Sequence, residues 1–203
     1  MKNALIKPAT LLLVAAAGLT ATLDAQAQST PWLVRVRAVY LDSANGGSTS
    51  PNLDLSINNK LIPELDISYF VTPEFSAELV LTYPQKQKVR SAGTEIGTLK
   101  HLPPTLTGQY HFYGLGPVTP YVGAGLNYTR FSSVSLPAGV TISKNSYGLA
   151  VQAGADFAIA PNMVVNLDLK KVQIRTDINL AGNKIGQLKV DPWLLGVGVG
   201  WRF

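Results

Sequence analysis

The sequence predicts an all-β fold, an eight-stranded antiparallel transmembrane β-barrel of the outer-membrane type. Three observations lead to this prediction: segments of about 10 residues in which apolar and polar residues alternate, connections that alternate in length, and an N-terminal export signal. Hydrophobic residues make up 46% of the 203 residues and charged residues 14%. Beyond the N-terminal stretch, Gly, Ser, Asn or a charge interrupts each apolar run, which a closed barrel tolerates and a spanning helix does not.

The N-terminal segment has the features of a cleaved signal peptide. Two lysines precede an apolar run at 9–20, and Ala25-Gln26-Ala27 then fits a signal-peptidase site. We expect residues 1–27 to be the signal peptide and residues 28–203 to form the transmembrane barrel. The alternative is a retained membrane anchor, which the short apolar run and the small residues after it disfavour.

Eight segments of period-two alternation follow, each bounded by turn residues. In chain order they are 32–41, 61–71, 75–83, 103–113, 120–131, 146–157, 163–176 and 189–203. The connections at 71–75, 113–120 and 157–163 are short and contain proline, whereas the other four are mostly longer and polar. Short turns are expected on the periplasmic side and long loops outside, so we place both termini in the periplasm.

The last strand sets the phase of all the others. Counting back from Phe203, alternate residues to Trp193 are aromatic or aliphatic, and we assign that face to lipid. Carried around the barrel, the same phase turns the following residues outward: Val34, Val36, Ala38 and Tyr40, then Leu65, Ile67 and Tyr69, then Ala77, Leu79, Leu81 and Tyr83, then Leu106, Gly108, Tyr110 and Phe112, then Val122, Ala124, Leu126 and Tyr128, then Tyr147, Leu149, Val151, Ala153 and Phe157, and finally Met163, Val165, Leu167 and Leu169.

The opposite face of the N-terminal strands is charged. We expect a charged lumen wall made by Arg35, Arg37, Glu64, Asp66, Glu78, Asp168 and Lys170. Because two arginines and two carboxylates fall on facing strands, an ion-pair network is favoured over a paired-carboxylate hydrolytic site. A soluble lipocalin-like barrel or sandwich would put its apolar residues inside, so this inward set disfavours that alternative.

Small residues dominate the inward face of the C-terminal strands. We expect the channel to be lined by Gly123, Gly125, Gly148, Gly154, Leu194, Gly196, Gly198 and Gly200. Glycines let a tightly coiled sheet bend around a small barrel, and they can also leave an open volume; both interpretations can hold together. No helix follows the alternating glycines at 196–200, so they do not form a dinucleotide-binding motif.

The chain offers little for catalysis. It has no cysteine and two histidines. His111 is expected to face the lumen near the periplasmic end, where Ser76 and Glu78 could approach it, but this arrangement is unspecific. His101 is expected to be solvated at the top of the same strand. We therefore predict no enzymatic activity, no metal and no cofactor.

The formal net charge of the chain is +5, with the basic side chains dispersed along the sequence. This disfavours a nucleic-acid partner and favours contact with the anionic headgroups of outer-membrane lipids and lipopolysaccharide. Lys171 is expected at the outer interface, where it either meets lipopolysaccharide phosphates or simply extends its ammonium toward water.

Three stretches resemble the outer membrane protein W (OmpW) family: 101–106 (HLPPTL), 120–131 (PYVGAGLNYTRF) and 191–203. The resemblance covers essentially the whole mature chain. It implies a monomeric barrel with a narrow, largely hydrophobic channel for passive passage of small hydrophobic molecules. It also implies that Val199, Trp201 and Phe203 are read by the barrel-assembly machinery. The third long loop, 132–145, is shorter than the family pattern.

Two other functions remain open at this point. One is a structural or adhesive barrel with a packed lumen, whose loops bind partners or lipopolysaccharide. The other is a lipid-modifying enzyme, which would need a serine, a histidine and a carboxylate together near the outer leaflet. An interior of eight strands is just wide enough for side chains, so free diffusion of hydrated solutes is excluded.

Overall fold

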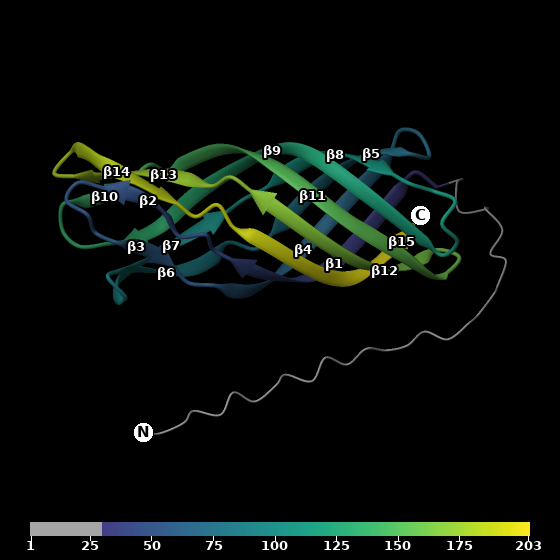
Figure 1. Cartoon of the computed structure of the whole chain (residues 1–203), viewed down its shortest axis with the longest axis horizontal. Coiled ribbons are helices and arrows are strands. Elements are labelled where there is room, and N and C mark those ends of the chain that lie inside the picture. The colour runs from purple at the N-terminus through teal and green to yellow at the C-terminus, as the bar shows by residue number, and fades with distance from the viewer. Residues whose placement is uncertain (1–29) are drawn as a thin grey trace, which may run out of the picture.

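Eight antiparallel strands close into an elongated barrel in the computed structural model, which describes residues 30–203 (Figure 1). The predicted signal peptide lies outside the described residues. In order around the barrel the strands are β1 (Trp32–Asp42), β4 (Lys60–Phe70), β5 (Phe75–Thr82), β8 (Thr105–His111), β9 (Val118–Ser135), β11 (Asn145–Ala160), β12 (Met163–Val172) and β15 (Trp193–Arg202). The predicted fold class is confirmed.

The first and last strands complete the circle. β15 pairs with β1, with Val34 opposite Trp201 and Leu41 opposite Leu194. Each barrel strand therefore has a hydrogen-bonded neighbour on both sides, which satisfies the backbone polar groups as a bilayer requires. Within residues 30–203, no helix is long and apolar enough to cross a membrane.

The outer surface of the barrel carries the apolar residues, with the phase that the sequence predicts. Val36, Leu126 and Val197 are each about half exposed or more, although they are aliphatic. Exposed aromatic residues form a lower girdle and an upper girdle around this band. The lower girdle contains Trp32, Tyr69, Phe75, Tyr110, Phe112 and Phe157, and the upper one Tyr40, Tyr83, Tyr128, Tyr147 and Trp193.

The barrel continues beyond the upper girdle, at the end opposite the C-terminus (Figure 1). Seven further strands build this extension: β2 (Gly46–Thr49), β3 (Leu55–Ile57), β6 (Gln85–Ser91), β7 (Thr94–Leu102), β10 (Val140–Ile142), β13 (Arg175–Leu180) and β14 (Asn183–Lys189). β7 pairs with the far part of β9, and β10, β13, β14 and β2 form a separate four-stranded sheet. Since long connections face outside, this end is extracellular.

The expectation that these long connections are polar loops is wrong. Their inward residues form a hydrophobic core that is continuous with the upper lumen and includes Val89, Leu99, Phe131, Ile178 and Leu188. Each segment contributes only a few apolar residues between turns and charges, so none reads as a strand alone. Packing against the other connections is what pairs them into sheets.

Candidate functional site in the barrel lumen

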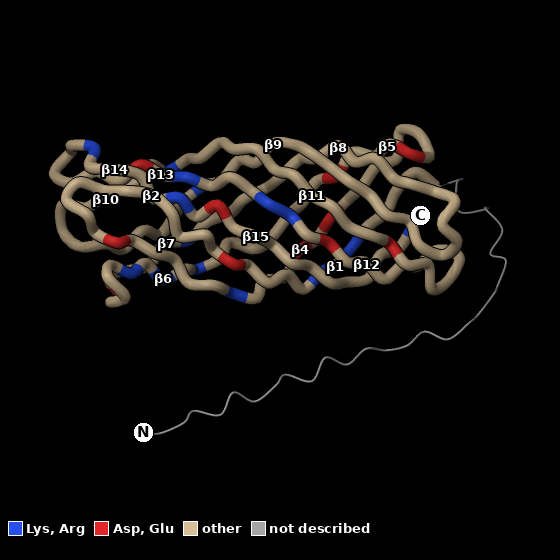
Figure 2. Tube along the Cα trace, in the orientation of Figure 1, with Lys and Arg blue, Asp and Glu red and all other residues tan. Residues whose placement is uncertain are grey.

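The predicted charged wall is one buried ion-pair network that crosses the lower lumen. Register brings its members together, since Arg35 lies opposite Asp66 and Arg37 lies opposite Glu64 on the neighbouring strand. Figure 2 marks acidic and basic positions along the part of the barrel where β1, β4, β11 and β12 are labelled. All seven residues predicted for the wall are at most 5% exposed.

Arg37 is the centre of the network. Its Nε lies 2.6 Å from Asp66 Oδ2, its Nη1 lies 3.0 Å from Asp168 Oδ1, and its Nη2 lies 3.1 Å from Glu78 Oε2. These three carboxylates come from β4, β12 and β5. A planar guanidinium can donate in several directions at once, so one side chain links three strands across the lumen.

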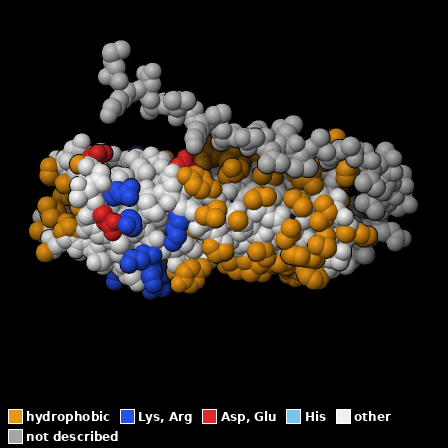
Figure 3. All heavy atoms as spheres, turned by 90° about the horizontal axis from the view of Figure 1, so that it is seen from below, with side chains coloured by type: hydrophobic (Ala, Val, Ile, Leu, Met, Phe, Trp, Pro, Cys, Tyr) orange, Lys and Arg blue, Asp and Glu red, His pale blue; other side chains and the backbone are white. Residues whose placement is uncertain are grey.

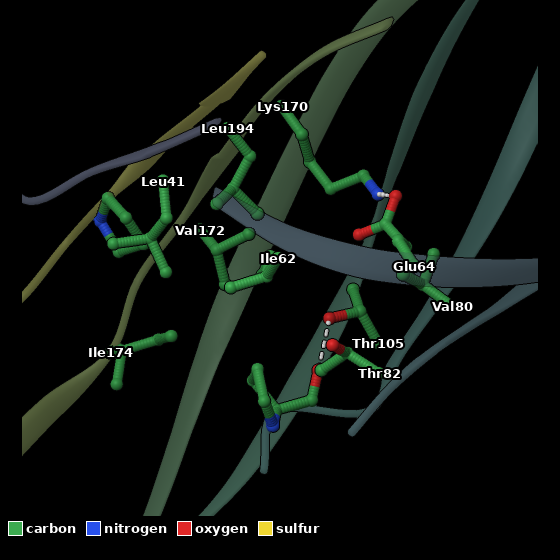
Figure 4. A pocket seen from close by; sticks show the side chains of 12 residues that line it. Leu41, Ile62, Glu64, Val80, Thr82, Thr105, Lys170, Val172, Ile174 and Leu194 are labelled. Carbon is green, nitrogen blue, oxygen red and sulfur yellow. Dashed lines mark hydrogen bonds and ion pairs between the residues drawn. The ribbon is translucent and has the colours of Figure 1, made fainter. Parts of the chain in front are cut away.

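Arg35 lies on the periplasmic side of Arg37 and pairs twice. Its Nη1 donates to Glu78 at 2.9 Å and its Nε donates to Asp156 at 3.0 Å. Its side chain is fully buried. On the extracellular side, Lys170 Nζ lies 3.2 Å from Glu64 Oε1 (Figure 4). The network therefore spans several residues along the barrel axis.

Five members of this network were missed from the sequence: Ser68, Tyr121, Gln152, Asp156 and Asn166. Asp156 pairs with Arg35, and Ser68 accepts from Arg35 at 2.9 Å. Tyr121 donates to Asp168 at 2.8 Å, Asn166 donates to Asp156 at 2.8 Å, and Gln152 donates to Glu78 at 3.1 Å. All five lie in the inward phase of their strands, so alternation alone could have found them. Tyr121 and Gln152 satisfy carboxylate oxygens that the cations do not reach.

Charge does not balance within the network. Three cations, Arg35, Arg37 and Lys170, face five carboxylates, Glu64, Asp66, Glu78, Asp156 and Asp168. Polar donors and the close packing of the arginines make this arrangement a floor that closes the lower lumen. An apolar solute would have to break buried ion pairs to pass it.

The inward glycines serve this packing, and they do not border an open volume as one interpretation of the sequence supposed. A Cβ at Gly198 would lie 2.1 Å from the backbone oxygen of Val36 and 2.8 Å from Arg37 Cγ. At Gly154 it would lie 2.4 Å from the hydroxyl of Tyr121. The other predicted lining residues also lie on the inward phase: Gly123, Gly125, Gly148, Leu194, Gly196 and Gly200. Close approach is the physical reason for the glycines.

The upper lumen combines a hydrophobic core with uncharged polar side chains such as Gln87 and Asn127, and a small cavity lies where it meets the charged floor. The cavity measures about 20 Å³, room for one water. Glu64 and Lys170 form its polar side (Figure 4). The rest of its lining is apolar or hydroxylic: Leu41, Ile62, Val80, Thr82, Pro103, Thr105, Val172, Ile174, Pro192 and Leu194.

The cavity adjoins a break in the hydrogen-bond ladder of the wall. Pairing between β5 and β8 ends at Val80 opposite Thr105, and pairing resumes between β6 and β7 at Gln85 opposite His101. The intervening residues include Pro84 on one side and Pro103-Pro104 on the other. Prolines lack the N–H that a ladder needs, so the wall lacks ladder hydrogen bonds between these two segments.

The two histidines are both buried. His111 faces the lumen as predicted, and its Nε2 lies 3.0 Å from Ser76 Oγ. Glu78 is instead held by Arg35, Arg37 and Gln152, and within residues 30–203 no carboxylate is hydrogen-bonded to His111. The expectation that His101 is solvated is wrong, because it is 1% exposed. It lies in the extracellular extension, where burial and, to a lesser extent, nearby Lys60 lower its pKa to about 4.

The C-terminal residues face the side that the sequence predicts. Val199, Trp201 and Phe203 share the outward phase at the periplasmic end, and Phe203 is 63% exposed. Lys171 lies at the upper girdle, with Nζ 4.9 Å from the centre of the Trp193 ring and donating to the carbonyl of Asp191.

Comparison with known proteins decides the family. The OmpW family model matches residues 33–203. The chain belongs to the OmpW family.

Two of three similar proteins are named outer-membrane proteins. The chain is 42% identical to the uncharacterized outer-membrane protein y4mB of Sinorhizobium fredii, over 90% of this chain and 84% of that protein. It is 29% identical to the dibenzothiophene metabolism operon protein PahQ of Pseudomonas aeruginosa, over 87% of this chain and 90% of that protein. The crystal structure of the outer membrane protein OprG of Pseudomonas aeruginosa matches with a TM-score of 0.76 and 25% sequence identity. The match covers 87% of this chain and 97% of OprG. This OmpW-family barrel is thus an outer-membrane protein.

Proposed function

We propose that this OmpW-family barrel lets small hydrophobic molecules pass from outside into the outer membrane. The observation that carries the proposal is the change of lumen chemistry along the axis: the upper interior has a hydrophobic core whose buried polar neighbours, such as Gln87 and Thr129, are uncharged, and buried charges close it below. An apolar molecule gains by leaving water for the upper lumen, at roughly 25 cal/mol per Å² of apolar surface buried. Moving deeper, toward the buried charges, brings no further gain in free energy.

The apolar molecule leaves the lumen through the break in the hydrogen-bond ladder, above the last β5–β8 pair. The cavity above the charged floor touches Val80, Pro103 and Thr105, which flank the unpaired part of the wall. Opening the wall at this place sacrifices few backbone hydrogen bonds, whereas opening the floor separates buried ion pairs at about 3 to 5 kcal/mol each. Release is therefore sideways into the bilayer.

The name of one relative agrees with an apolar cargo. PahQ, which is 29% identical to this chain, is named for a dibenzothiophene metabolism operon. Dibenzothiophene is a flat, uncharged ring system. For the present chain this supports the class of cargo, small and apolar, and does not single out a compound.

Filling the cavity tests the proposal. In Val80→Trp the indole would fill the cavity and press against its lining, because Val80 lines the cavity and is 4% exposed. Leu79→Trp is the matched control, since Leu79 is the next residue on the same strand and faces lipid. Both proteins would be placed in vesicles with a lipopolysaccharide outer leaflet, and uptake of a small fluorescent naphthalene derivative would be followed.

We expect uptake to fall to the protein-free level in Val80→Trp and to stay at the wild-type level in Leu79→Trp. Equal uptake by two equally folded variants would contradict a route past Val80. Protein-free uptake by the wild type would favour the structural alternative, a barrel with a packed lumen, which the small size of the cavity also supports.

A further inference from the structure

A row of three basic side chains lies just above the upper aromatic girdle. Lys86 on β6, Lys100 on β7 and Arg130 on β9 alternate with buried residues, so all three turn outward. Arg130 follows Tyr128 by two residues on the same face, about 7 Å along the strand, which at a tilt of about 40° places it about 5 Å beyond the girdle. Figure 3 shows basic side chains gathered directly beside the apolar band.

The register of the sheet sets these charges side by side. Lys86 lies directly opposite Lys100, and Lys100 lies opposite Ser132, two residues along β9 from Arg130. Like charges directly opposite each other destabilise an antiparallel pair. An anion between them would remove that cost.

Acidic neighbours do not supply this anion. Within residues 30–203, no carboxylate lies within salt-bridge distance of Lys86, Lys100 or Arg130. Farther along the same hairpin Lys88 pairs with Glu95 at 2.8 Å, and on the β13–β14 hairpin Lys184 pairs with Asp177 at 2.8 Å. The basic row is open where the barrel surface leaves the apolar band.

We infer that the basic row is a binding site for the phosphate groups of the glycolipid in the outer leaflet. Its height above the girdle matches the level at which headgroup phosphates meet the hydrocarbon region. The guanidinium of Arg130 can bind a phosphate with two parallel hydrogen bonds, and the two lysines act as point charges beside it. The site lies on the outer surface of β6, β7 and β9, so it is independent of the proposed passage through the lumen.

The test compares two double variants of the full-length chain that remove equal charge. Lys86→Gln with Lys100→Gln removes the facing pair, whereas Arg90→Gln with Lys184→Gln removes two exposed or half-exposed extracellular cations outside the row. The folded barrels would be placed in phosphatidylcholine nanodiscs and titrated with diphosphorylated lipid A, with lipid A lacking phosphate, and with inorganic phosphate.

Each lysine near an anionic lipid surface contributes about fivefold in affinity, so the facing pair accounts for about 25-fold. We expect the first variant to lose about that factor for diphosphorylated lipid A and the second to bind like the wild type. Lipid A without phosphate should bind weakly to all three proteins, and inorganic phosphate should not compete at millimolar concentration. Equal losses in both variants, or no loss in the first, would overturn the inference, as would competition by free phosphate.

Discussion

Single residues in the lower lumen do more than fill space, because each arginine is shared between strands. Arg37 contacts carboxylates from β4, β5 and β12, and Arg35 contacts carboxylates from β5 and β11. A buried ion pair adds little net stability over an apolar pair, but removal of one partner leaves the others uncompensated. The network therefore behaves as a unit.

Replacing Arg37 with Met should destabilise the barrel by about 3 to 5 kcal/mol, because three buried carboxylates would lose their shared cation. Urea unfolding in lipid vesicles, followed by tryptophan fluorescence, measures this change. Lys88→Gln is the control, since its ion pair is exposed and should leave the unfolding midpoint unchanged. A midpoint for Arg37→Met equal to that of the control would contradict the network's role.

Protonation of His101 should loosen the extracellular extension. Burial lowers the pKa of His101 to about 4, from an ordinary value of 6.5. The neutral imidazole is therefore favoured by the fold, so its contribution is fully present above pH 6.5 and is lost as pH falls from 6.5 toward 4. Hydrogen exchange of β6 and β7 measured at pH 7 and pH 5 should show faster opening at pH 5.

His101→Leu serves as the control for that measurement. A leucine cannot be protonated, so the ratio of exchange rates between the two pH values, after correction for intrinsic exchange, should fall toward one. The same pH dependence in the variant would assign the effect to another group.

A side chain at Gly198 should prevent the barrel from closing. The Cβ of Gly198→Leu would meet the backbone of β1 at Val36 and also the side chain of Arg37. Val197→Leu, on the lipid face of the same strand, should fold normally because Val197 is exposed. The folded fraction of each variant after refolding into detergent can be read from its gel mobility, and a fully folded Gly198→Leu would refute the close-packing explanation.

Among the strands, β15 combines two tasks on its two faces. Its inward glycines let Arg35 and Arg37 pack against it, while its outward residues end in Trp201 and Phe203 at the periplasmic rim. In the extension, β6 and β7 show a different combination. Inward residues such as Val89 and Leu99 join the hydrophobic core, and the outward residues include Lys86 and Lys100 of the basic row.

Deletion of Phe203 should impair assembly more than stability. Phe203 is 63% exposed, so its removal forfeits less than the 1.5 to 3 kcal/mol or so of a fully buried side chain. We expect less barrel in the outer membrane of cells, with little change in the urea midpoint of the protein that does insert. Normal insertion combined with a lowered midpoint would reverse this interpretation.

At the scale of the whole molecule, the eight barrel strands form a closed sheet, and this closure governs how the protein behaves. No barrel strand has a free edge that could recruit a second copy, and the outer band is adapted to lipid. The extracellular extension adds a hydrophobic core outside the bilayer, so the folded unit is longer than the membrane is thick.

We expect a heat-modifiable monomer. Unheated protein in dodecyl sulfate should migrate differently from boiled protein, because the closed hydrogen-bond circuit resists detergent at room temperature. Light scattering in mild detergent should give the mass of one chain. A dimer that dissociates only on boiling would contradict a monomeric barrel.

Alternation in the sequence identifies the face of each transmembrane strand that meets lipid. This assignment is sufficient to predict a transmembrane barrel. Alternation with period two is a local property, so Val36, Leu126 and Val197 reveal their side without knowledge of their neighbours. The same local rule placed Arg37, Glu64 and Asp168 inside. It did not identify their partners, because cross-barrel distance depends on closure.

The contents of the lumen and the length of the barrel follow from contacts that form only in the folded chain. The glycines of β15 suggested space in the sequence, but Arg37 from the adjacent strand occupies it. His101 is polar and follows Lys100 in the chain, yet it is buried in the extension, where β7 pairs with β6 on one side and β9 on the other. Both outcomes rest on contacts between segments distant in sequence, and the free energy of those contacts is absent from any single segment.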